Sequence, residues 1–293
     1  MKAIRLIGII AALSVAALTQ TPQVMAQERP RTIPLSPYLG VLWSFEADFG
    51  GKRRTFLFDT AGGITAITPE SAAEIACLPW GQLTGFRMRG DRVDLPRCDD
   101  VTIRSNGATL AAPTVGVLDF STLLPKDAPP LAGSVALDSF AGNVVTIDLA
   151  HRQIVLETTA SMKRRISSGR EVELRLSREV AGLAMTPFVA VQTPKGKVWM
   201  ELDTGSNSSI IVSAHDAELF AMKPHDKEPQ TFRGKLVGDI ALAVDDARSM
   251  PLAIDGNIGA GVLKDWIVTL DIVRGRAWFS PASGSWTAIA SDQ

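Results

Sequence analysis

The sequence predicts a mostly β protein that contains two copies of one unit and a few short helices. Three observations predict it: short runs of alternating apolar residues end at Gly, Pro, Asn or Asp, helical signals are few, and one order of motifs occurs twice. The strands expected in the first copy are residues 41–49, 53–58, 101–104, 144–149 and 153–157.

Two segments carry the start signals of short helices. Thr68 precedes a Pro and a Glu, which predicts a helix that is capped by the Thr and runs to about Ala76. In the second half, the Ser-x-x-Asp pattern from Ser213 to Asp216 predicts another helix start with a capping box.

The repeat itself is the main signal. Residues 56–62 (FLFDTAG) and 200–206 (MELDTGS) each end an apolar strand with Asp-Thr, and each is followed by a second strand and a short helix. Each copy then closes with an apolar segment containing Gly and a strand ending in Asp, at residues 133–148 and 256–271. The order of elements is therefore kept twice.

The N-terminus predicts export. A basic start is followed by an uncharged apolar run over residues 6–18 and by small residues before a cleavage site near Ala26, which is typical of a secretory signal peptide. An uncleaved anchor is the alternative. We expect a protein of the periplasm or the extracellular space. The predicted division is a signal peptide (1–26), an extended leader rather than core (27–37), a first unit (38–160) and a second unit (171–293), with a polar boundary near residues 161–170.

The charge balance excludes some partners. Without Lys2 and Arg5 of the signal peptide, 28 of the 30 basic residues remain against 31 acidic ones, so the net charge is near −3. This gives no electrostatic footprint for nucleic acid. No later apolar run is long enough to span a bilayer, so we expect no stable membrane span in the mature chain. We expect a monomer.

Cys77 and Cys98 are the only cysteines. In an exported chain such a pair predicts a disulfide, and two separate buried thiols are the alternative. His151, His215 and His225 share no ligand-type spacing with other residues, so we predict no metal site and no cofactor.

The paired Asp-Thr motifs carry a resemblance to a family. A strand, then Asp-Thr-Gly or Asp-Thr-Ala, then a strand, a short helix and an apolar segment with Gly resembles the retropepsin-like and pepsin-like aspartic proteases, over nearly the whole mature chain. The short chain looks nearer to bacterial exported retropepsin-like proteins of a single-chain, two-lobed type. The resemblance implies two duplicated acid-protease lobes with the site at their interface.

The resemblance also implies an activity, aspartic endopeptidase. Asp59 and Asp203 would form a dyad that holds one proton, because two adjacent carboxylates cannot both ionise. The ionised member would activate a water that attacks a peptide or unfolded protein substrate. The Thr hydroxyls would lock the two turns together. The residues expected to support the dyad are Thr60, Gly62, Thr204, Gly205 and Ser206.

One residue departs from the family pattern. Ala61 stands where the family has Gly, and we expect its methyl group to crowd the dyad and to disfavour a positive φ. The neighbouring Gly62 and Gly63 give the loop freedom to adjust. The alternative function is therefore a catalytically weak or inactive peptide-binding homologue.

Strand alternation and a hairpin indicate the cleft. Residues two apart share a face of a strand, so Leu57 should point with Asp59 and Glu201 with Asp203. We hypothesise that Glu201 favours a basic substrate side chain; a solvated Glu at the edge is the alternative. Residues 85–94 form a predicted flap hairpin between the cysteines. Its cleft candidates are Phe86 and Met88, and residues 231–235 are its counterpart in the second unit.

Two other site types are weaker candidates. A Ser-His-Asp hydrolase would use Ser206, His215 and Asp216, but the chain has no Gly-x-Ser-x-Gly elbow. The glycines at 256–261 lack the spacing and the βαβ setting of a dinucleotide loop.

Overall fold

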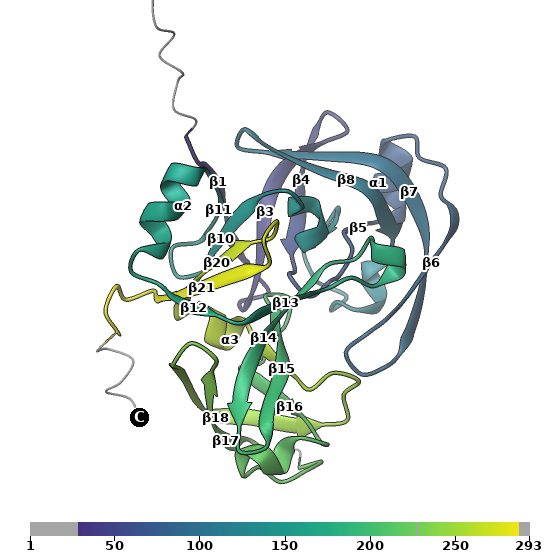
Figure 1. The fold of residues 1–293 in the computed structure, drawn as a ribbon. Coiled ribbons are helices and arrows are strands. Elements are labelled where there is room, and N and C mark those ends of the chain that lie inside the picture. The colour runs from purple at the N-terminus through teal and green to yellow at the C-terminus, as the bar shows by residue number, and fades with distance from the viewer. Residues whose placement is uncertain (1–28, 227, 287–293) are drawn as a thin grey trace, which may run out of the picture.

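In the computed structural model, residues 29–226 and 228–286 form three β-sheets with a few short helices (Figure 1). The eight-stranded sheet has the order β2-β3-β4-β9-β5-β8-β7-β6 and lies at the upper right of Figure 1. Its strands are β2 (Ser36–Tyr38), β3 (Leu42–Phe49), β4 (Lys52–Phe58), β5 (Ala66–Ile67), β6 (Trp80–Phe86), β7 (Arg92–Ser105), β8 (Ala108–Val117) and β9 (Gly133–Val135).

The seven-stranded sheet has the order β13-β14-β15-β19-β16-β18-β17 and lies at the bottom of the view (Figure 1). Its strands are β13 (Leu174–Ser177), β14 (Thr186–Thr193), β15 (Gly196–Asp203), β16 (Ile210–Ser213), β17 (Gln230–Leu236), β18 (Ile240–Met250) and β19 (Gly256–Gly259). The pairings around its centre match those of the eight-stranded sheet. The strand before each Asp-Thr turn pairs in parallel with β9 or β19, and the strand after the turn pairs with them antiparallel.

The six-stranded sheet, β1-β11-β10-β20-β21-β12, takes strands from both halves of the chain. At its centre, β10 pairs antiparallel with β20, and Thr146 lies opposite Thr269, with 2.9 Å between their hydroxyl oxygens. These two residues occupy corresponding places in the repeated tails. The strands are β1 (Arg31–Pro34), β10 (Val144–Asp148), β11 (Gln153–Glu157), β12 (Arg170–Val172), β20 (Trp266–Asp271) and β21 (Arg276–Pro281).

The helices are short. Helix α1 is capped by Thr68, whose hydroxyl accepts a hydrogen bond from the Ser71 N–H, and Pro69 stands in its first turn. A second helix, α2, begins with a capping box between Thr158 and Ser161 and covers one side of the six-stranded sheet (Figure 1). The α-helices are α1 (Pro69–Glu74), α2 (Thr159–Ile166) and α3 (Ala260–Leu263), and the 3-10 helices are η1 (Phe120–Thr122), η2 (Leu137–Phe140), η3 (Val180–Gly182) and η4 (Ala217–Phe220).

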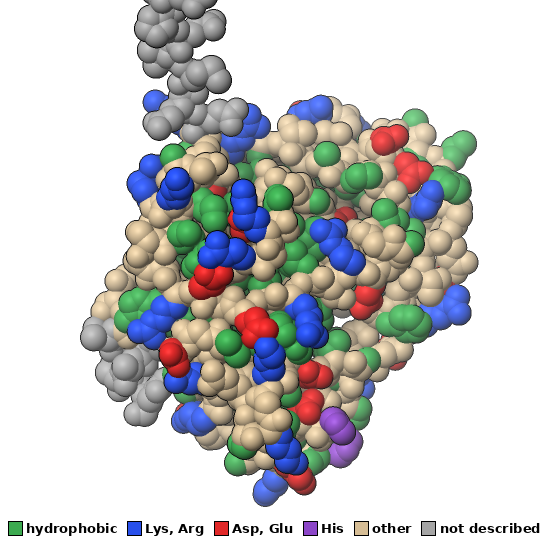
Figure 2. Space-filling view, viewed as in Figure 1, with side chains coloured by type: hydrophobic (Ala, Val, Ile, Leu, Met, Phe, Trp, Pro, Cys, Tyr) green, Lys and Arg blue, Asp and Glu red, His purple; other side chains and the backbone are tan. Residues whose placement is uncertain are grey.

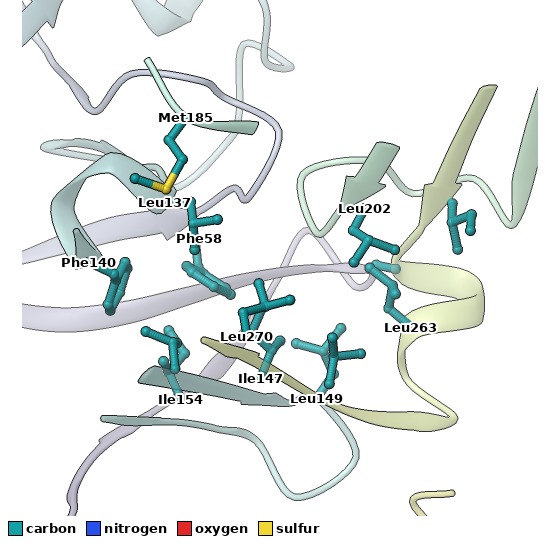
Figure 3. Packing of buried hydrophobic residues seen from close by; sticks show 14 of the residues in the cluster. Phe58, Leu137, Phe140, Ile147, Leu149, Ile154, Met185, Leu202, Leu263 and Leu270 are labelled. Atoms are coloured by element: carbon teal, nitrogen blue, oxygen red, sulfur yellow. The ribbon is translucent and has the colours of Figure 1, made fainter. Parts of the chain in front are cut away.

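One apolar core connects the three sheets. Figure 3 shows Phe58 packed beside Phe140, with Ile147 and Leu270 of the six-stranded sheet below them. Leu202 lies in the same layer. Phe58 and Leu202 directly precede the two aspartates, and both are buried. Burial of these two side chains therefore fixes the strand ends from which the aspartates project.

The mostly β prediction is confirmed, as are the strands expected in the first half and the capped helix α1. The prediction of a helix that begins with a capping box at Ser213 is wrong. After Ser213 the chain makes a turn in which the Asp216 N–H donates to the Ser213 carbonyl, and the capping box is replaced by the 3-10 helix η4. Residues 161–166 of the expected polar boundary region belong to α2.

The expected leader is only partly as predicted. Its described residues are extended, but β1 pairs with β11, and Ile33 and Leu35 are buried. The leader therefore contributes to the core, because its alternation of apolar residues matches the inner face of the sheet. The predicted signal peptide, residues 1–26, lies outside the described residues. In the described part of the chain, no helix is long and apolar enough to cross a membrane.

The predicted disulfide is present between Cys77 and Cys98, whose Cα atoms lie 6.1 Å apart. Cys77 follows α1, and Cys98 is buried on β7. The bond therefore ties the end of α1 to the strand whose first residues form the hairpin with β6.

Replacing both cysteines, Cys77→Ala with Cys98→Ala, is expected to lower the free energy of unfolding by about 3 kcal/mol, because the unfolded chain regains the freedom of the closed loop. Urea unfolding followed by tryptophan fluorescence measures the change. Reduced wild-type protein should unfold at the same urea concentration as the variant. Equal stability of the variant and the oxidised protein would contradict the prediction.

Candidate active site

The two Asp-Thr turns lie at equivalent places in their sheets. β4 pairs in parallel with β9, and β15 pairs in parallel with β19. Asp59 follows the end of β4, and Asp203 is the last residue of β15. The Asp59 N–H donates to the Val135 carbonyl and continues the β4–β9 pairing past the end of β4. The first turn is thus held by its own sheet before any contact with the second.

Thr60 and Thr204 exchange hydrogen bonds across the two halves. The Thr60 N–H donates to Thr204 Oγ1 at 3.0 Å, and the Thr204 N–H donates to Thr60 Oγ1 at 3.0 Å. Each hydroxyl in turn donates to the carbonyl before the opposite aspartate, Leu202 at 2.6 Å and Phe58 at 3.1 Å. Both threonines are completely buried. The expected lock between the turns is therefore present in atomic detail.

The carboxyl groups of Asp59 and Asp203 lie close enough for the charge of one to shift the pKa of the other. Asp59 Oδ1 accepts a hydrogen bond from the Ala61 N–H at 3.0 Å, and the Gly62 N–H donates to the Asp59 backbone carbonyl at 3.3 Å. Burial, followed by the charge of Asp203, raises the pKa of Asp59 to about 7. The pair therefore still holds a proton close to neutral pH.

Asp203 receives more donors than Asp59. The Gly205 N–H donates to Asp203 Oδ1 at 2.8 Å, and Asn257 Nδ2 donates to Asp203 Oδ2 at 2.7 Å. Burial raises the pKa of Asp203, while these donors and Asp59 oppose the shift. Because donors stabilise the charged form of a carboxyl group, the negative charge of the pair is favoured on Asp203.

A third carboxyl group lies beside the pair. Glu201 is only 7% exposed, and its Oε2 accepts a hydrogen bond from Asn257 Nδ2 at 3.2 Å. Burial and the charge of Asp203 raise the pKa of Glu201 well above its ordinary value. The amide of Asn257 thus links two carboxyl groups, and the alternative of a solvated Glu at the edge is wrong.

The crowding beside the carboxyl pair is at Gly205, whereas the sequence predicts it at Ala61. A Cβ on Gly205 would lie 2.4 Å from Asp59 Cγ, which no side chain can occupy. A Cβ on Gly62 would lie 3.3 Å from Asp59 Oδ2. Ala61 does not adopt a positive φ, so the expected backbone strain at this residue is wrong; Gly63 takes that conformation, with a φ of 68°.

The two turns open into a cavity of about 330 Å³. Asp59, Asp203 and Glu201 line it, and so do Phe86 and Met88 of the hairpin, as predicted for the cleft. Leu57, the other cleft candidate, is buried and is absent from the cavity wall.

The β6–β7 hairpin closes one side of this cavity. Its tip reaches the loop after β18, where the Ala253 N–H donates to the Met88 carbonyl at 2.8 Å (Figure 1). Figure 2 shows the surface hollowed between the upper and lower parts of the molecule at the right of the view. The expected counterpart, residues 231–235, lies on β17 and does not line the cavity.

The sequence analysis missed several residues of the site. Asn257 is fully buried at the register position beside Glu201, and Glu179 lines the cavity. Asp138 accepts from the Thr65 N–H and hydroxyl at 3.0 and 2.7 Å, and burial raises its pKa to about 6. The tail repeat carried a signal for Asn257, since it occupies the place of Ser134 in the first copy.

The alternative hydrolase triad does not form. The Ser206 hydroxyl accepts from the Ser208 N–H, and within residues 29–226 and 228–286 no hydrogen bond joins Ser206, His215 and Asp216. Among the same residues, no three His, Cys, Asp or Glu side chains gather in a way that could hold a metal ion.

Two solved structures with the same fold are seed globulins. The basic 7S globulin of soybean superposes with a TM-score of 0.57 at 11% identity, over 86% of this chain and 94% of its own. Conglutin gamma, a basic 7S globulin from lupine seeds, gives a TM-score of 0.57 at 11% identity, over 86% and 95%. No family model and no curated protein matches the chain significantly.

These comparisons correct the family assignment. The chain had been assigned to the retropepsin-like and pepsin-like aspartic proteases, as a bacterial exported two-lobed type, and no match supports that assignment. The structural likeness is to plant seed globulins instead. The Asp-Thr motifs predicted the wrong family because they reflect only the local fold around two strand ends. Proteins of very different sequence share such a local fold.

Thr60→Val is expected to lower the free energy of unfolding by about 2–4 kcal/mol, because it leaves the buried Thr204 N–H and Leu202 carbonyl without partners. Thr60→Ser keeps the hydroxyl and is the matched control, with a loss of about 1 kcal/mol for one methyl group. Chemical denaturation compares the two. If both variants unfold alike, the hydroxyl does not hold the turns together.

Gly205→Ala and Ala61→Gly exchange the residues at the two equivalent positions. Gly205→Ala should displace Asp59 and lower the free energy of unfolding by more than about 1 kcal/mol, because the new methyl group overlaps its carboxyl group. Ala61→Gly should change stability by about 1 kcal/mol or less. Thermal unfolding measures both. A Gly205→Ala variant as stable as wild type would show that the turn has room the structure does not give it.

Proposed function

We propose that the protein hydrolyses peptide bonds with a water held between Asp59 and Asp203. The observation that carries the proposal is the pair of neighbouring carboxyl groups, fixed by the Thr60–Thr204 exchange and open to a cavity. Such a pair supplies an acid and a base at one point without a covalent intermediate. The substrate would be an extended peptide or an unfolded segment of a protein.

In this mechanism Asp203 is the base and Asp59 the acid in the first step. Two donors, the Gly205 N–H and Asn257 Nδ2, stabilise the charge of Asp203, which accepts a proton from the water. The water oxygen attacks the peptide carbonyl carbon, and Asp59 donates its proton to the carbonyl oxygen. When the C–N bond breaks, a proton passes from the pair to the departing nitrogen. The pair titrates as one unit, so both pKa values belong to it jointly.

The arrangement proposed around this pair is two duplicated lobes of the acid-protease kind. The matching strand pairings, the reciprocal threonine contact and the Thr146–Thr269 contact support it, because equivalent residues that contact each other lie on a two-fold axis. The predicted units 38–160 and 171–293 remain the proposed division. The disulfide fits an oxidising compartment, so we keep the proposal of an exported protein.

Peptide binding without turnover is the second candidate. The methyl group of Ala61 lines the cavity beside the pair, and the two similar structures are named as globulins rather than as peptidases. In this case the cavity and its hairpin would hold a peptide, and the carboxyl pair would act only as a hydrogen-bonding group.

Cleavage of an unfolded protein, followed by mass spectrometry, separates the candidates. Wild-type protein should cleave it, and Asp59→Asn and Asp203→Asn should each lower the rate by at least about 1,000-fold, since each removes one member of the proton-transfer pair. Glu218→Gln, on the exposed side of η4, is the control for the loss of one carboxylate. Equal cleavage by wild type and both Asn variants would refute the mechanism, and binding without cleavage would favour the second candidate.

The same assay has an expected pH profile. The pKa of Asp59 is raised to about 7, so the rate should fall as pH rises through about 7 and the pair loses its last proton. On the acid side the rate should fall once Asp203 is protonated. Because burial raises the pKa of Asp203, that fall comes above the ordinary Asp value of about 3.9. A rate that still rises above pH 8 would contradict this assignment.

A further inference from the structure

The cavity wall is chemically uneven. The first half of the chain contributes apolar side chains from the hairpin and from the segment after β8, with Leu83, Leu95, Leu118 and Phe120. The second half contributes the carboxyl groups of Glu201 and Glu179. A bound peptide therefore meets both an apolar and an acidic surface.

Glu201 has no basic partner. Its side chain is 7% exposed, and it forms no ion pair in the described part of the chain. A carboxyl group buried to this degree is normally paired with a cation or satisfied by several donors. Here only Asn257 donates to it, at Oε2. The other oxygen, Oε1, receives no hydrogen bond from any described residue although the side chain lines the cavity.

Asn257 fixes the orientation of the Glu201 carboxyl group and so the position of its Oε1. Both contacts of its Nδ2 are used, one to Glu201 Oε2 and one to Asp203 Oδ2. Asn257 is fully buried, so Glu201 cannot turn away without losing this contact. The Glu201 carboxyl group is thus held in place with one oxygen unused.

Glu179 lies at the outer part of the same wall. It is exposed, and its charge acts on Glu201. The residue after it, Val180, lies against Gly85 of the hairpin, so the acidic wall is continuous with the hairpin. Arg87 at the hairpin tip is the one basic residue among those that line the cavity, and in the described chain it forms no ion pair with Glu179 or Glu201.

We propose that Glu201, with Glu179 at its entrance, forms a subsite for a lysine or arginine side chain of the bound peptide, next to an apolar residue that lies against the hairpin. The part of this inference that concerns cleavage rests on the proposed function; the part that concerns binding does not. An ammonium or guanidinium group would donate to Glu201 Oε1 and would favour the ionised form of this carboxyl group, whose pKa burial raises in the free protein. The apolar residues of the cavity wall can pack against the long stem of either side chain.

Binding of matched peptides tests the subsite without cleavage. The peptides carry a reduced amide bond at the centre, an apolar residue on one side and either lysine or norleucine on the other, in both orders. Fluorescence anisotropy gives the dissociation constant for the full chain. The lysine peptide should bind at least about tenfold more tightly than the norleucine peptide in one of the two orders, because a close charge pair in a buried site contributes this much or more. Acetylated lysine should bind like norleucine.

Substitutions test whether Glu201 causes the preference for lysine over norleucine. Glu201→Gln keeps the size of the side chain and should reduce the lysine preference to less than about threefold, with the norleucine peptide bound as by wild type. Glu218→Gln should keep the full preference. No lysine preference in wild type, or an unchanged preference in Glu201→Gln, would overturn the proposal. If Glu201→Gln does not fold, Glu179→Gln decides, since it should lower the preference by about twofold or more, and an unchanged preference rejects the subsite.

The two proposals fail in different ways. A lysine preference that Glu201→Gln removes, together with no cleavage of any substrate, would reject hydrolysis and keep the subsite in a binding protein. Cleavage that depends on Asp59 and Asp203 but has no preference for a basic residue on either side of the bond would keep hydrolysis and reject the subsite.

Discussion

The exchange of hydrogen bonds between Thr60 and Thr204 is the contact on which the rest of the site depends. It joins residues 144 positions apart, and it does so without exposure to water. Hydrogen bonds in such surroundings are strong when made and costly when missing, so the two strand ends have one favourable arrangement. That arrangement sets the distance between the aspartates. The six-stranded sheet below repeats the constraint through Thr146 and Thr269, so neither half can rotate without breaking a buried pair.

This constraint brings three carboxyl groups together. Burial raises the pKa of Asp59, Asp203 and Glu201, and the charge of Asp203 raises the pKa of Asp59 and Glu201 further. The site offsets part of that cost with donors, and it distributes them unevenly: backbone N–H groups serve both aspartates, while the Asn257 amide serves only Asp203 and Glu201. The result is a site arranged for one negative charge at a defined position. A pair with equal surroundings would leave that charge undetermined.

The sequence predicted the local parts of this site and missed the parts that depend on packing. Asp59 and Asp203 could be found because each follows an apolar strand in a repeated order. Strand alternation alone could not predict which side chains line the cavity. Leu57 and Glu201 occupy equivalent faces, yet only Glu201 reaches the cavity, since coverage by other strands decides exposure. Asn257 was missed because its role arises from parallel pairing of β15 with β19, which brings together residues far apart in the chain.

The differences between the two halves are concentrated where a ligand would lie. The scaffold is matched: the threonines, the apolar residues before the aspartates and the central strand pairings have counterparts in both halves. The positions around the carboxyl pair are not. Three equivalent pairs differ there: Leu57 and Glu201, Ser134 and Asn257, and Ala61 and Gly205. A symmetric scaffold with an asymmetric lining suits a peptide, because a peptide has a direction and presents different side chains on either side of any bond. The asymmetry extends to the pair itself, since the Asn257 amide donates to Asp203 Oδ2 at 2.7 Å, whereas Asp59 Oδ1 accepts from the Ala61 N–H.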